Sequence, residues 1–197
     1  VVKLNTSNQL VVSIWKALIT TRTFSDTSQW NNLVVAVDTT QTTAADRIKV
    51  YINGVQLTDF GTANYPTSSA NLAWGVNSTA HYIGARDTSG DEWQGYLAQT
   101  AYITGSQLTP SSFGQTDTSS NRWVPKDISG LTFGNTGFLL DYSNGSDLGE
   151  DYVPSATTSY AITVANPGSG NKYYIDTVLQ ATKELIEGAT YTFDQSD

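Results

Sequence analysis

The hydrophobic pattern of the chain is clearest between residues 30 and 60. Residues 33–37 form a continuous apolar run, and residues 47–53 then alternate strictly between polar and apolar side chains. Ile48, Val50 and Ile52 would share one face, which is the period of a strand with one buried and one wet side. Asn53-Gly54 follows, a pair that tolerates positive φ at both central positions of a tight turn. The stretch predicts a hairpin at the centre of an antiparallel β-sandwich.

Similar but shorter patterns extend over the rest of the first 153 residues. Further strands are expected in residues 1–12 around a turn at 5–8, and at residues 80–84, 96–103 and 138–142. Loops are expected at residues 20–28, 61–77, 86–92 and 143–151. Thr109 and Pro110 fit the N-cap and first position of a single helical turn over residues 108–113.

The composition changes near Pro154, where a linker of small residues begins. Alternation at residues 160–164, an apolar run at 173–175 and a last alternation at 191–193 predict further short strands. We therefore expect a sandwich over residues 1–153, with an irregular aromatic-rich extension at 106–153, followed by a small β-module over 154–197. So few strands are marginal alone, so we expect the module to continue beyond Asp197 and further sandwich strands to precede Val1.

The composition narrows the classes of function. Only 14% of the 197 residues are charged, and the formal net charge is −8. No basic stripe is visible, so no nucleic-acid partner is expected. The absence of cysteine excludes disulfides and thiolate metal sites. No apolar run approaches the roughly 20 residues that span a bilayer, so no membrane insertion is expected. The chain also lacks methionine, so we expect Val1 to follow processing or to begin a fragment.

Several motifs in the first half of the chain resemble the laminin-G/pentraxin group of concanavalin A-like domains. The match begins with Trp30, continues through the strand 33–37 to Asp38, and includes the Lys-Val-Tyr-Ile-Asn-Gly run at 49–54. His-Tyr-Ile-Gly at 81–84 and Gly-Tyr-Leu-Ala at 95–98 are similar to the next two strands of that fold. The resemblance implies an all-β, two-sheet antiparallel jelly-roll sandwich, in which Trp30 and Trp123 belong to the scaffold.

Motifs in the second half of the chain resemble one particular version of this domain. Residues 108–114, 123–126 and 137–141 look like a version of this domain found in virion proteins of tailed phages, especially marine ones. Residues 171–176 and 188–197 are similar to the opening of a small β-module that often follows it. The resemblance implies a location in the virion or outside the cell, with other virion chains as partners and a homo-oligomeric assembly.

Catalytic groups in a recognisable arrangement are scarce. Concanavalin A-like glucanases place paired carboxylates at alternate positions of one strand, so that both flank the scissile bond. The close acidic pairs here, Asp91-Glu92 and Glu150-Asp151, are adjacent and lie in expected loops, where neighbouring side chains diverge. His81 is the single histidine and is expected to pack in its strand. We therefore expect no enzymatic activity.

Two acidic loops are candidate calcium sites, the loop at residues 141–151 and, as the weaker candidate, the tip with Asp87, Asp91 and Glu92. Calcium takes six to eight oxygen ligands from carboxylates, amides and carbonyls. The candidate ligands within residues 141–151 are Asp141, Asn144, Asp147 and Asp151, with Glu150 beside them. The alternative is that spaced acids in a surface loop are simply solvated. Calcium is the only cofactor that the sequence suggests.

Tryptophan and tyrosine in the expected loops are candidates for carbohydrate binding. A sugar site needs an aromatic platform for the apolar C–H face, and amides or carboxylates for the hydroxyl groups. The candidate residues are Tyr65, Trp74, Asn77, Asp87, Asp91 and Trp93. The alternative is that these aromatic side chains only hold their own loops in place.

The resemblance, together with these observations, implies a non-enzymatic virion structural protein, such as a tail fibre, an appendage or a capsid decoration. Low-charge, Thr-rich strands suit lateral packing, and open sheet edges could pair with other chains. Host-surface glycans are the expected ligand if the protein has one. A secreted bacterial lectin-like adhesion domain is the alternative, and a glycoside hydrolase comes third.

Overall fold

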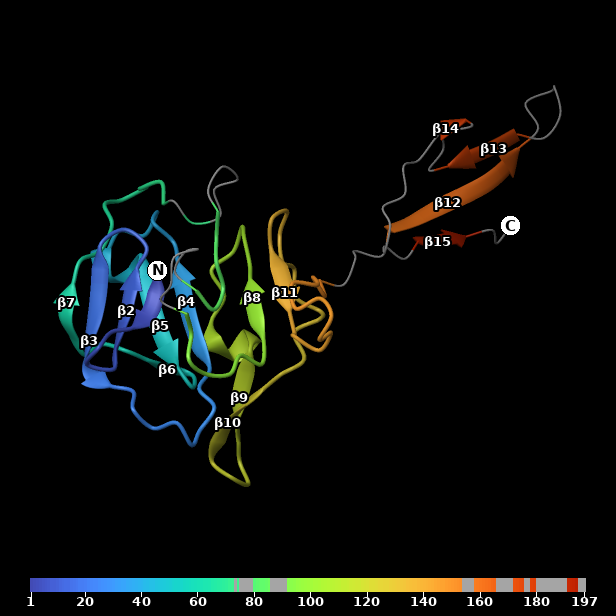
Figure 1. Cartoon of the computed structure of the whole chain (residues 1–197). Helices are drawn as coiled ribbons and strands as arrows, with labels where there is room; N and C mark the ends of the chain where they lie inside the picture. Colours follow the sequence, from blue (N-terminus) through green and yellow to red (C-terminus); the bar gives the residue numbers. More distant parts are fainter. Residues whose placement is uncertain are drawn as a thin grey trace. The chain divides into compact units, whose positions relative to one another are not determined.

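The computed structural model of the chain describes residues 1–72, 74, 80–85 and 92–153, together with the backbone of four strands in residues 158–194. Within these residues the fold is all-β (Figure 1). The helical turns found there are two short 3₁₀ segments, η1 (Ala44–Asp46) and η2 (Pro110–Ser112), and the second confirms the predicted turn with Pro110 at its start. Among the described residues, no helix has the length and apolar character needed to cross a membrane.

The first sheet has the order β1-β2-β3-β7 and is antiparallel throughout. Its strands are β1 (Val2–Leu4), β2 (Gln9–Ser13), β3 (Ala17–Thr23) and β7 (Phe60–Ala63). The turn between β1 and β2 is set by Asn5, whose Oδ1 accepts hydrogen bonds from the backbone N–H groups of Ser7 and Gln9. Asn8 takes a positive φ of 56° there, which Asn tolerates better than most residues. The predicted pair of strands around residues 5–8 is confirmed.

The second sheet contains the predicted central hairpin. It has the order β4-β5-β6, with β4 (Leu33–Val37), β5 (Ile48–Ile52) and β6 (Val55–Gln56). Asn53 and Gly54 join β5 to β6 with φ values of 48° and 80°. Two consecutive positive φ angles match the type I′ turn that Asn-Gly predicts, so the expected hairpin is confirmed.

One hydrophobic cluster joins the two sheets into a sandwich. Leu10, Val12 and Leu18 come from the first sheet, whereas Ile48 and Val50 come from the second. Leu57, directly after β6, completes the buried cluster. The polar side chains of β5 face away from this cluster, as the alternation predicts. The strand order consists of a meander in each sheet and one returning strand, which does not by itself make a jelly roll, so the jelly-roll connectivity stays a prediction.

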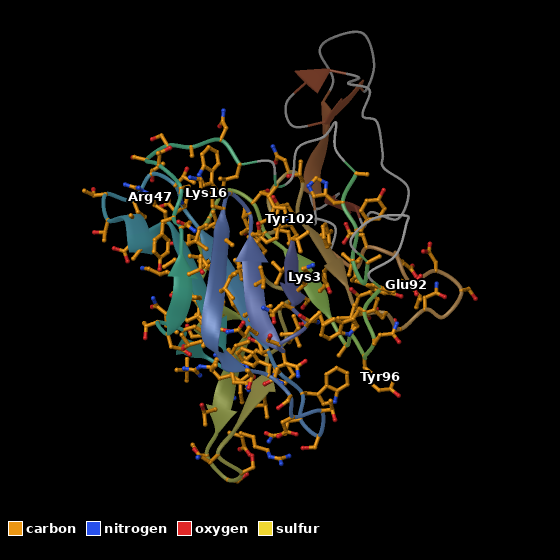
Figure 2. The ribbon with its side chains drawn as sticks, turned by 60° about the vertical axis from the view of Figure 1, so that its left-hand side comes forward. Lys3, Lys16, Arg47, Glu92, Tyr96 and Tyr102 are labelled. Carbon is orange, nitrogen blue, oxygen red and sulfur yellow. The ribbon has the colours of Figure 1, made fainter. Side chains whose placement is uncertain are left out.

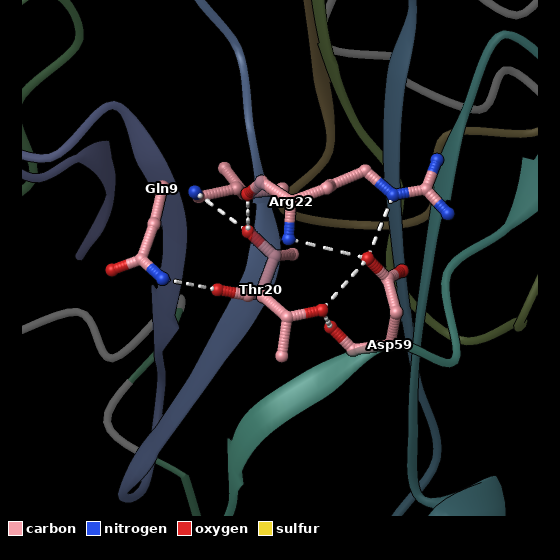
Figure 3. Close-up of polar contacts among 6 residues, drawn as sticks. Gln9, Thr20, Arg22 and Asp59 are labelled. Atoms are coloured by element: carbon pink, nitrogen blue, oxygen red, sulfur yellow. Dashed lines mark hydrogen bonds and ion pairs between the residues drawn. The ribbon is translucent and has the colours of Figure 1, made fainter.

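The side-chain hydroxyl of Thr20 takes the place of a backbone hydrogen-bonding partner in the first sheet. Between Gln9 and Val11 the register of β2 and β3 shifts, and Thr20 is fully buried at this irregularity. Its hydroxyl accepts a hydrogen bond from Leu10 N (3.1 Å) and donates one to Arg22 O (2.8 Å) (Figure 3). The expected loop at residues 20–28 is therefore wrong in its first four residues. β-branched Thr suits a strand, and this hydroxyl satisfies groups that an apolar side chain would leave unpaired.

The residues before β7 are tied to β3 by an ion pair. Arg22 Nε lies 2.8 Å from Asp59 Oδ2, and Thr21 N donates to Asp59 O at 2.7 Å (Figure 3). The hydrogen bond from Arg22 is the main cause that lowers the pKa of Asp59. The expected loop at residues 61–77 is wrong at its start, because residues 61–63 continue β7 as a paired strand.

Arg47 holds two loops at one side of the sandwich. Its Nε, Nη2 and Nη1 donate to the carbonyl oxygens of Gln41, Thr42 and Pro66, each at 2.8 Å. In Figure 2 Arg47 lies on the side of the sandwich away from Tyr96. The fixed fork of the guanidinium suits several acceptors at once, so this side chain sets the path of both loops.

Two short antiparallel ribbons follow the sandwich in the first unit. β8 (Thr100–Tyr102) pairs with β11 (Phe138–Leu140), and β9 (Gly114–Asp117) pairs with β10 (Arg122–Pro125). The strand predicted at residues 138–142 is thus confirmed in its first three residues. The extension expected to be irregular contains the β9–β10 ribbon, because its Thr, Trp and Val positions pair across a short turn.

Trp123 joins the β9–β10 ribbon to the central hairpin. Its ring lies against the Cα atoms of Gly54 and Gly114, where a side chain on either glycine would collide with it. The small size of both glycines therefore lets the indole contact the backbone of two separate hairpins. The expectation that Trp123 belongs to the scaffold agrees with this position.

Of the two strand predictions in residues 80–103, the first is wrong and the second is confirmed only in part. Residues 80–84 form no strand, and of residues 96–103 only Thr100–Tyr102 do so. The apolar residues of these runs are largely exposed, with Tyr96 86% accessible. A single backbone bond from Trp93 N to Gly84 O (2.7 Å) links the two segments. An alternating pattern forms a strand only where a neighbour accepts its backbone bonds, and within the described part of the chain only residues 100–102 of these runs have such a neighbour, β11.

The chain divides into two compact units, Val1–Asp151 and Tyr152–Asp197. The second unit contains a sheet of order β14-β13-β12-β15. Its strands are β12 (Thr158–Ala165), β13 (Lys172–Ile175), β14 (Val178–Leu179) and β15 (Tyr191–Asp194). β12 pairs antiparallel with β13 and parallel with β15. The strands expected at residues 160–164, 173–175 and 191–193 are confirmed.

Candidate functional site

A groove of about 300 Å³ lies beside β11 in the first unit. Three segments that are distant in the sequence line it: the 81–83 segment, β11 and the end of the 143–151 loop. The lining residues are His81, Ile83, Phe138, Leu140, Gly149 and Asp151. Its surface is thus mainly apolar, with one imidazole and one carboxylate at its border.

The register of β11 explains why Phe138 and Leu140 face the groove. Leu139 is buried, and neighbouring side chains of a strand point to opposite faces. Leu139 N donates to Asp151 Oδ1 at 2.9 Å, so the carboxylate takes a backbone bond at the free edge of this short ribbon. Asp151 is thereby fixed at the groove, where its carboxylate stands beside the apolar lining.

A row of aromatic rings leads from the surface to the groove. Trp74 contacts Tyr102 edge to face with ring centroids 6.2 Å apart, and Tyr102 contacts Phe138 at 5.6 Å. Both distances lie in the range in which aromatic pairs attract each other beyond simple burial. Phe138 lines the groove and Trp74 stays partly exposed, so the row presents one continuous aromatic surface.

Trp93 does not line the groove, but its backbone is bonded to a segment that does. Its backbone bond to Gly84 places it next to the segment that contributes Ile83. The indole packs on Gly95, and 47% of the side chain remains accessible. Tyr96 follows and points away from the ribbon (Figure 2). Exposed aromatic side chains are therefore concentrated around this part of the first unit.

The structure separates the residues that the sequence grouped as a carbohydrate site. Trp74 is connected to the groove by the aromatic row and Trp93 by its backbone bond. Tyr65 does not: it packs against the sandwich core, and burial raises the pKa of its hydroxyl. Asn77, Asp87 and Asp91 lie outside the described residues. Asp151, expected as a calcium ligand, lines the groove instead.

No protein-family model matches the chain, and neither a curated protein nor a solved structure matches it. The chemistry of the groove therefore has to be inferred from its own residues.

The acidic loop gives no support to the calcium hypothesis. Within the described residues, no three His, Asp or Glu side chains gather as metal ligands would. Asp141, Asn144 and Asp147 each accept a hydrogen bond from the backbone N–H two residues ahead. Such bonds form Asx turns, which explains the regular spacing of these residues without a metal. The calcium site stays a prediction.

The same turn recurs throughout the first unit. Asp26, Asp38, Asp117 and Asp127 each accept a bond from the N–H of a Ser or Thr two positions later. Hydrogen bonds from the hydroxyl groups of these Ser and Thr residues, and for Asp127 chiefly from the backbone N–H, favour the ionised form and lower the pKa of all four carboxyl groups. The repeated Asp-x-Ser/Thr pattern was visible in the sequence and marks turns rather than ligands.

Two contributions to the surface were not anticipated from the sequence. In the sequence, Ile83, Phe138 and Leu140 have the alternation of buried strand residues. The sequence does not show that one side of the β8–β11 ribbon is left uncovered, so that these side chains line a groove. Trp30, expected in the scaffold, is 67% accessible. Its position just before an apolar strand suggested that the indole would be buried, but Trp30 lies in the loop that precedes β4 and is exposed.

Proposed function

We propose that the chain is a non-enzymatic virion structural protein that binds a host-surface carbohydrate at the groove beside β11. The observation that carries the binding proposal is the combination of an apolar groove, a fixed carboxylate and an aromatic row that runs from Phe138 in the groove to the partly exposed Trp74. The virion role is supported by the resemblance of residues 108–114, 123–126 and 137–141 to tailed-phage proteins, and it covers a tail fibre, an appendage or a capsid decoration.

The chemistry of the groove fits one sugar unit better than a wholly apolar ligand. Phe138 and Leu140 offer C–H and ring contacts to the apolar face of a pyranose, whereas Asp151 can accept bonds from its hydroxyl groups. The Trp74–Tyr102–Phe138 row extends the platform for a second unit. Since the row and the strand are already packed, binding orders few side chains and loses little entropy.

A non-enzymatic role is supported by what surrounds the groove. Asp151 is occupied by the Leu139 backbone bond, and the neighbouring Glu150 accepts a bond from Asn144 Nδ2 at 2.7 Å. This geometry suits recognition, because each carboxylate is held by a structural partner.

The binding proposal is tested by a glycan array with the full chain and with Trp93→Ala. We expect wild-type binding to a limited group of glycans and a loss of about twofold to tenfold in apparent affinity for the variant, since an aromatic contact contributes about 0.5–1.5 kcal/mol. Trp15→Ala is the matched control, because Trp15 is 46% accessible and belongs to the β2–β3 turn. Equal binding by both variants would overturn the groove as the site.

The virion role is tested separately by peptide mass spectrometry of purified phage particles. We expect peptides of this chain in particles at a constant ratio to other virion proteins. Their presence only in culture medium would instead favour the secreted lectin-like adhesion domain, which would use the same groove.

A further inference from the structure

The chain contains two Asn-Gly pairs, at residues 53–54 and 144–145. In such a pair the backbone nitrogen of the glycine can attack the side-chain carbonyl carbon of the asparagine, because no Cβ on the glycine hinders the approach. A bond forms between the glycine N and the asparagine Cγ, and the bond between Cγ and Nδ2 breaks. The proton of the glycine N–H ends on Nδ2, which leaves as ammonia. Water opens the resulting five-membered imide to aspartate or isoaspartate, so water is the only co-reactant.

The first pair is held by the sandwich. Asn53 Oδ1 accepts a hydrogen bond from Asn32 N at 2.8 Å, and Asn53 Nδ2 donates to Asn31 Oδ1 at 3.1 Å. The Trp123 ring lies against Gly54, and the pair forms the tight turn between β5 and β6. Ring closure at Asn53 would have to break this turn and both side-chain bonds, so the fold opposes the reaction there.

The second pair lies in the loop between β11 and Asp151. Gly145 is exposed, and apart from its chain neighbours no described atom lies within 4 Å of the position that its Cβ would take. The backbone bonds recorded at this turn are local, such as that from Asp147 N to Asn144 O at 3.1 Å. The Gly145 nitrogen can therefore approach the amide of Asn144 without disturbing a sheet.

Two contacts of Asn144 favour the reaction itself. Ser146 N donates to Asn144 Oδ1 at 3.0 Å, and a donor on this oxygen stabilises the negative charge that the oxygen gains during the attack. Asn144 Nδ2 donates to Glu150 Oε2 at 2.7 Å, and this carboxylate stabilises the positive charge that Nδ2 gains as it takes up a proton and leaves. The Asn53 amide also has a donor on Oδ1, but its Nδ2 contacts the uncharged amide oxygen of Asn31.

We propose that Asn144 is a site of spontaneous deamidation, whereas Asn53 keeps its amide in the folded chain. The product has a carboxylate where Nδ2 donated to Glu150, so a hydrogen bond is replaced by repulsion between two negative charges. Glu150 precedes Asp151, whose Oδ1 accepts a bond from Leu139 N at the edge of β11. The acidic product therefore loosens the end of the loop that Asp151 attaches to β11. The proposal does not depend on carbohydrate binding at the groove.

The test incubates the folded full chain in ¹⁸O-labelled water at mildly alkaline pH and follows both asparagines by proteolysis and tandem mass spectrometry. We expect labelled aspartate and isoaspartate to accumulate at position 144 while position 53 stays asparagine. In concentrated urea both positions should react, because both are Asn-Gly pairs. An unchanged Asn144, or loss of the Asn53 amide at the same rate in the folded chain, would overturn the proposal.

Three variants separate the causes of the reaction. Gly145→Ala should slow deamidation of Asn144 about tenfold, because the added Cβ hinders the attack. Gly130→Ala is the matched control and should leave the rate unchanged, since its Cβ position is equally open but lies outside the loop. Glu150→Gln should slow the reaction about twofold to fivefold, because an exposed charged contact contributes modestly. A wild-type rate in Glu150→Gln would overturn the role of the carboxylate.

The structural consequence is tested with Asn144→Asp, which carries the aspartate product from the start. Amide hydrogen exchange at Leu139 should become about twofold to fivefold faster, since Asp151 is then held less firmly. Combining Asn144→Asp with Glu150→Gln removes the repulsion and should restore the wild-type exchange rate. Equal exchange at Leu139 in the wild type and in Asn144→Asp would overturn this consequence.

Discussion

The sandwich of residues 1–66 and the ribbons of residues 92–151 are both made of antiparallel strands, but different forces hold them together. In the sandwich, side chains of two sheets share one buried cluster around Leu18, Ile48 and Val50. In the ribbons, Ile128, Phe133 and Leu139 are buried outside that cluster, and single contacts such as Trp123 on two glycines join the parts. The comparison indicates that the shared core of the sandwich stabilises the unit, whereas the ribbons leave more of their side chains accessible to solvent.

The difference agrees with where the candidate site lies. The groove opens beside the β8–β11 ribbon, where a strand edge and an aromatic row remain accessible. Binding residues are commonly carried by loops on a rigid scaffold, and here the scaffold is the sandwich.

The largest expected effect is that of Leu18→Ala in the sandwich core. Leu18 is fully buried between the sheets, so its truncation should lower the free energy of unfolding by about 2–5 kcal/mol through lost burial and a residual cavity. Urea unfolding, followed by far-ultraviolet circular dichroism, measures this change. Leu139→Ala makes the same truncation in the ribbons and should have a smaller effect, because the surroundings can collapse more easily. An equal loss at Leu139 would contradict the contrast between the regions.

A smaller effect is expected for Gly54→Ala, which disturbs the contact between the two regions. A Cβ there would collide with the Trp123 ring, and the φ of 80° disfavours any other residue. We expect a loss of about 2–4 kcal/mol in the free energy of unfolding, with a changed Trp fluorescence spectrum. Gly105→Ala is the control for backbone strain, since its φ is 85° but no atom lies near its Cβ position, and Gly145→Ala has an open Cβ position as well. If Gly54→Ala behaves like Gly105→Ala, the Trp123 contact does not join the regions.

The smallest effect is expected for acid acting on the turn of the β9–β10 ribbon. Asp117 accepts bonds from Ser119 and Ser120, which hold the pKa of its carboxyl well below the ordinary value of 3.8. Because the folded-state pKa is lowered, this stabilisation is present above the unfolded pKa and is lost as the pH falls below about 4. Asp117→Asn should therefore reduce the Tm slightly at neutral pH, and the difference from wild type should vanish in strong acid. Thermal unfolding of both proteins between neutral pH and strong acid measures the two Tm values. A difference in Tm that stays the same at every pH would show that the charge of Asp117 is not the cause.

The sequence was informative wherever burial follows a regular period. Ile48, Val50 and the Asn53-Gly54 turn were predicted correctly, because alternation and turn chemistry are local properties. The sequence did not predict that residues 61–63 pair in β7 or that Tyr96 is exposed. Strand pairing depends on whether a distant segment of the chain lies alongside, which a local pattern does not show. A strand pattern and an unpaired surface segment look alike in sequence.

The candidate site follows the same rule. The interest in Trp74 and Trp93 came from their places in long connections, and both are connected to the groove, one through ring contacts and the other through a backbone bond. The partners that give the groove its shape, Phe138 and Leu140, belong to a strand and carry no sequence signal of a site. Trp30 was assigned to the scaffold by its position in a motif, whereas its exposure is determined by the path of the loop from β3 to β4.

The three hydrogen bonds of Arg47 bear on how this surface can vary. Its acceptors are the backbone carbonyl groups of Gln41, Thr42 and Pro66, not their side chains. Most substitutions at positions 41 and 42 leave a carbonyl group in the same place, so the outward-facing residues of that loop can be exchanged while Arg47 keeps its course. The path of this loop therefore depends on the side chain at position 47 and not on the side chains at positions 41 and 42.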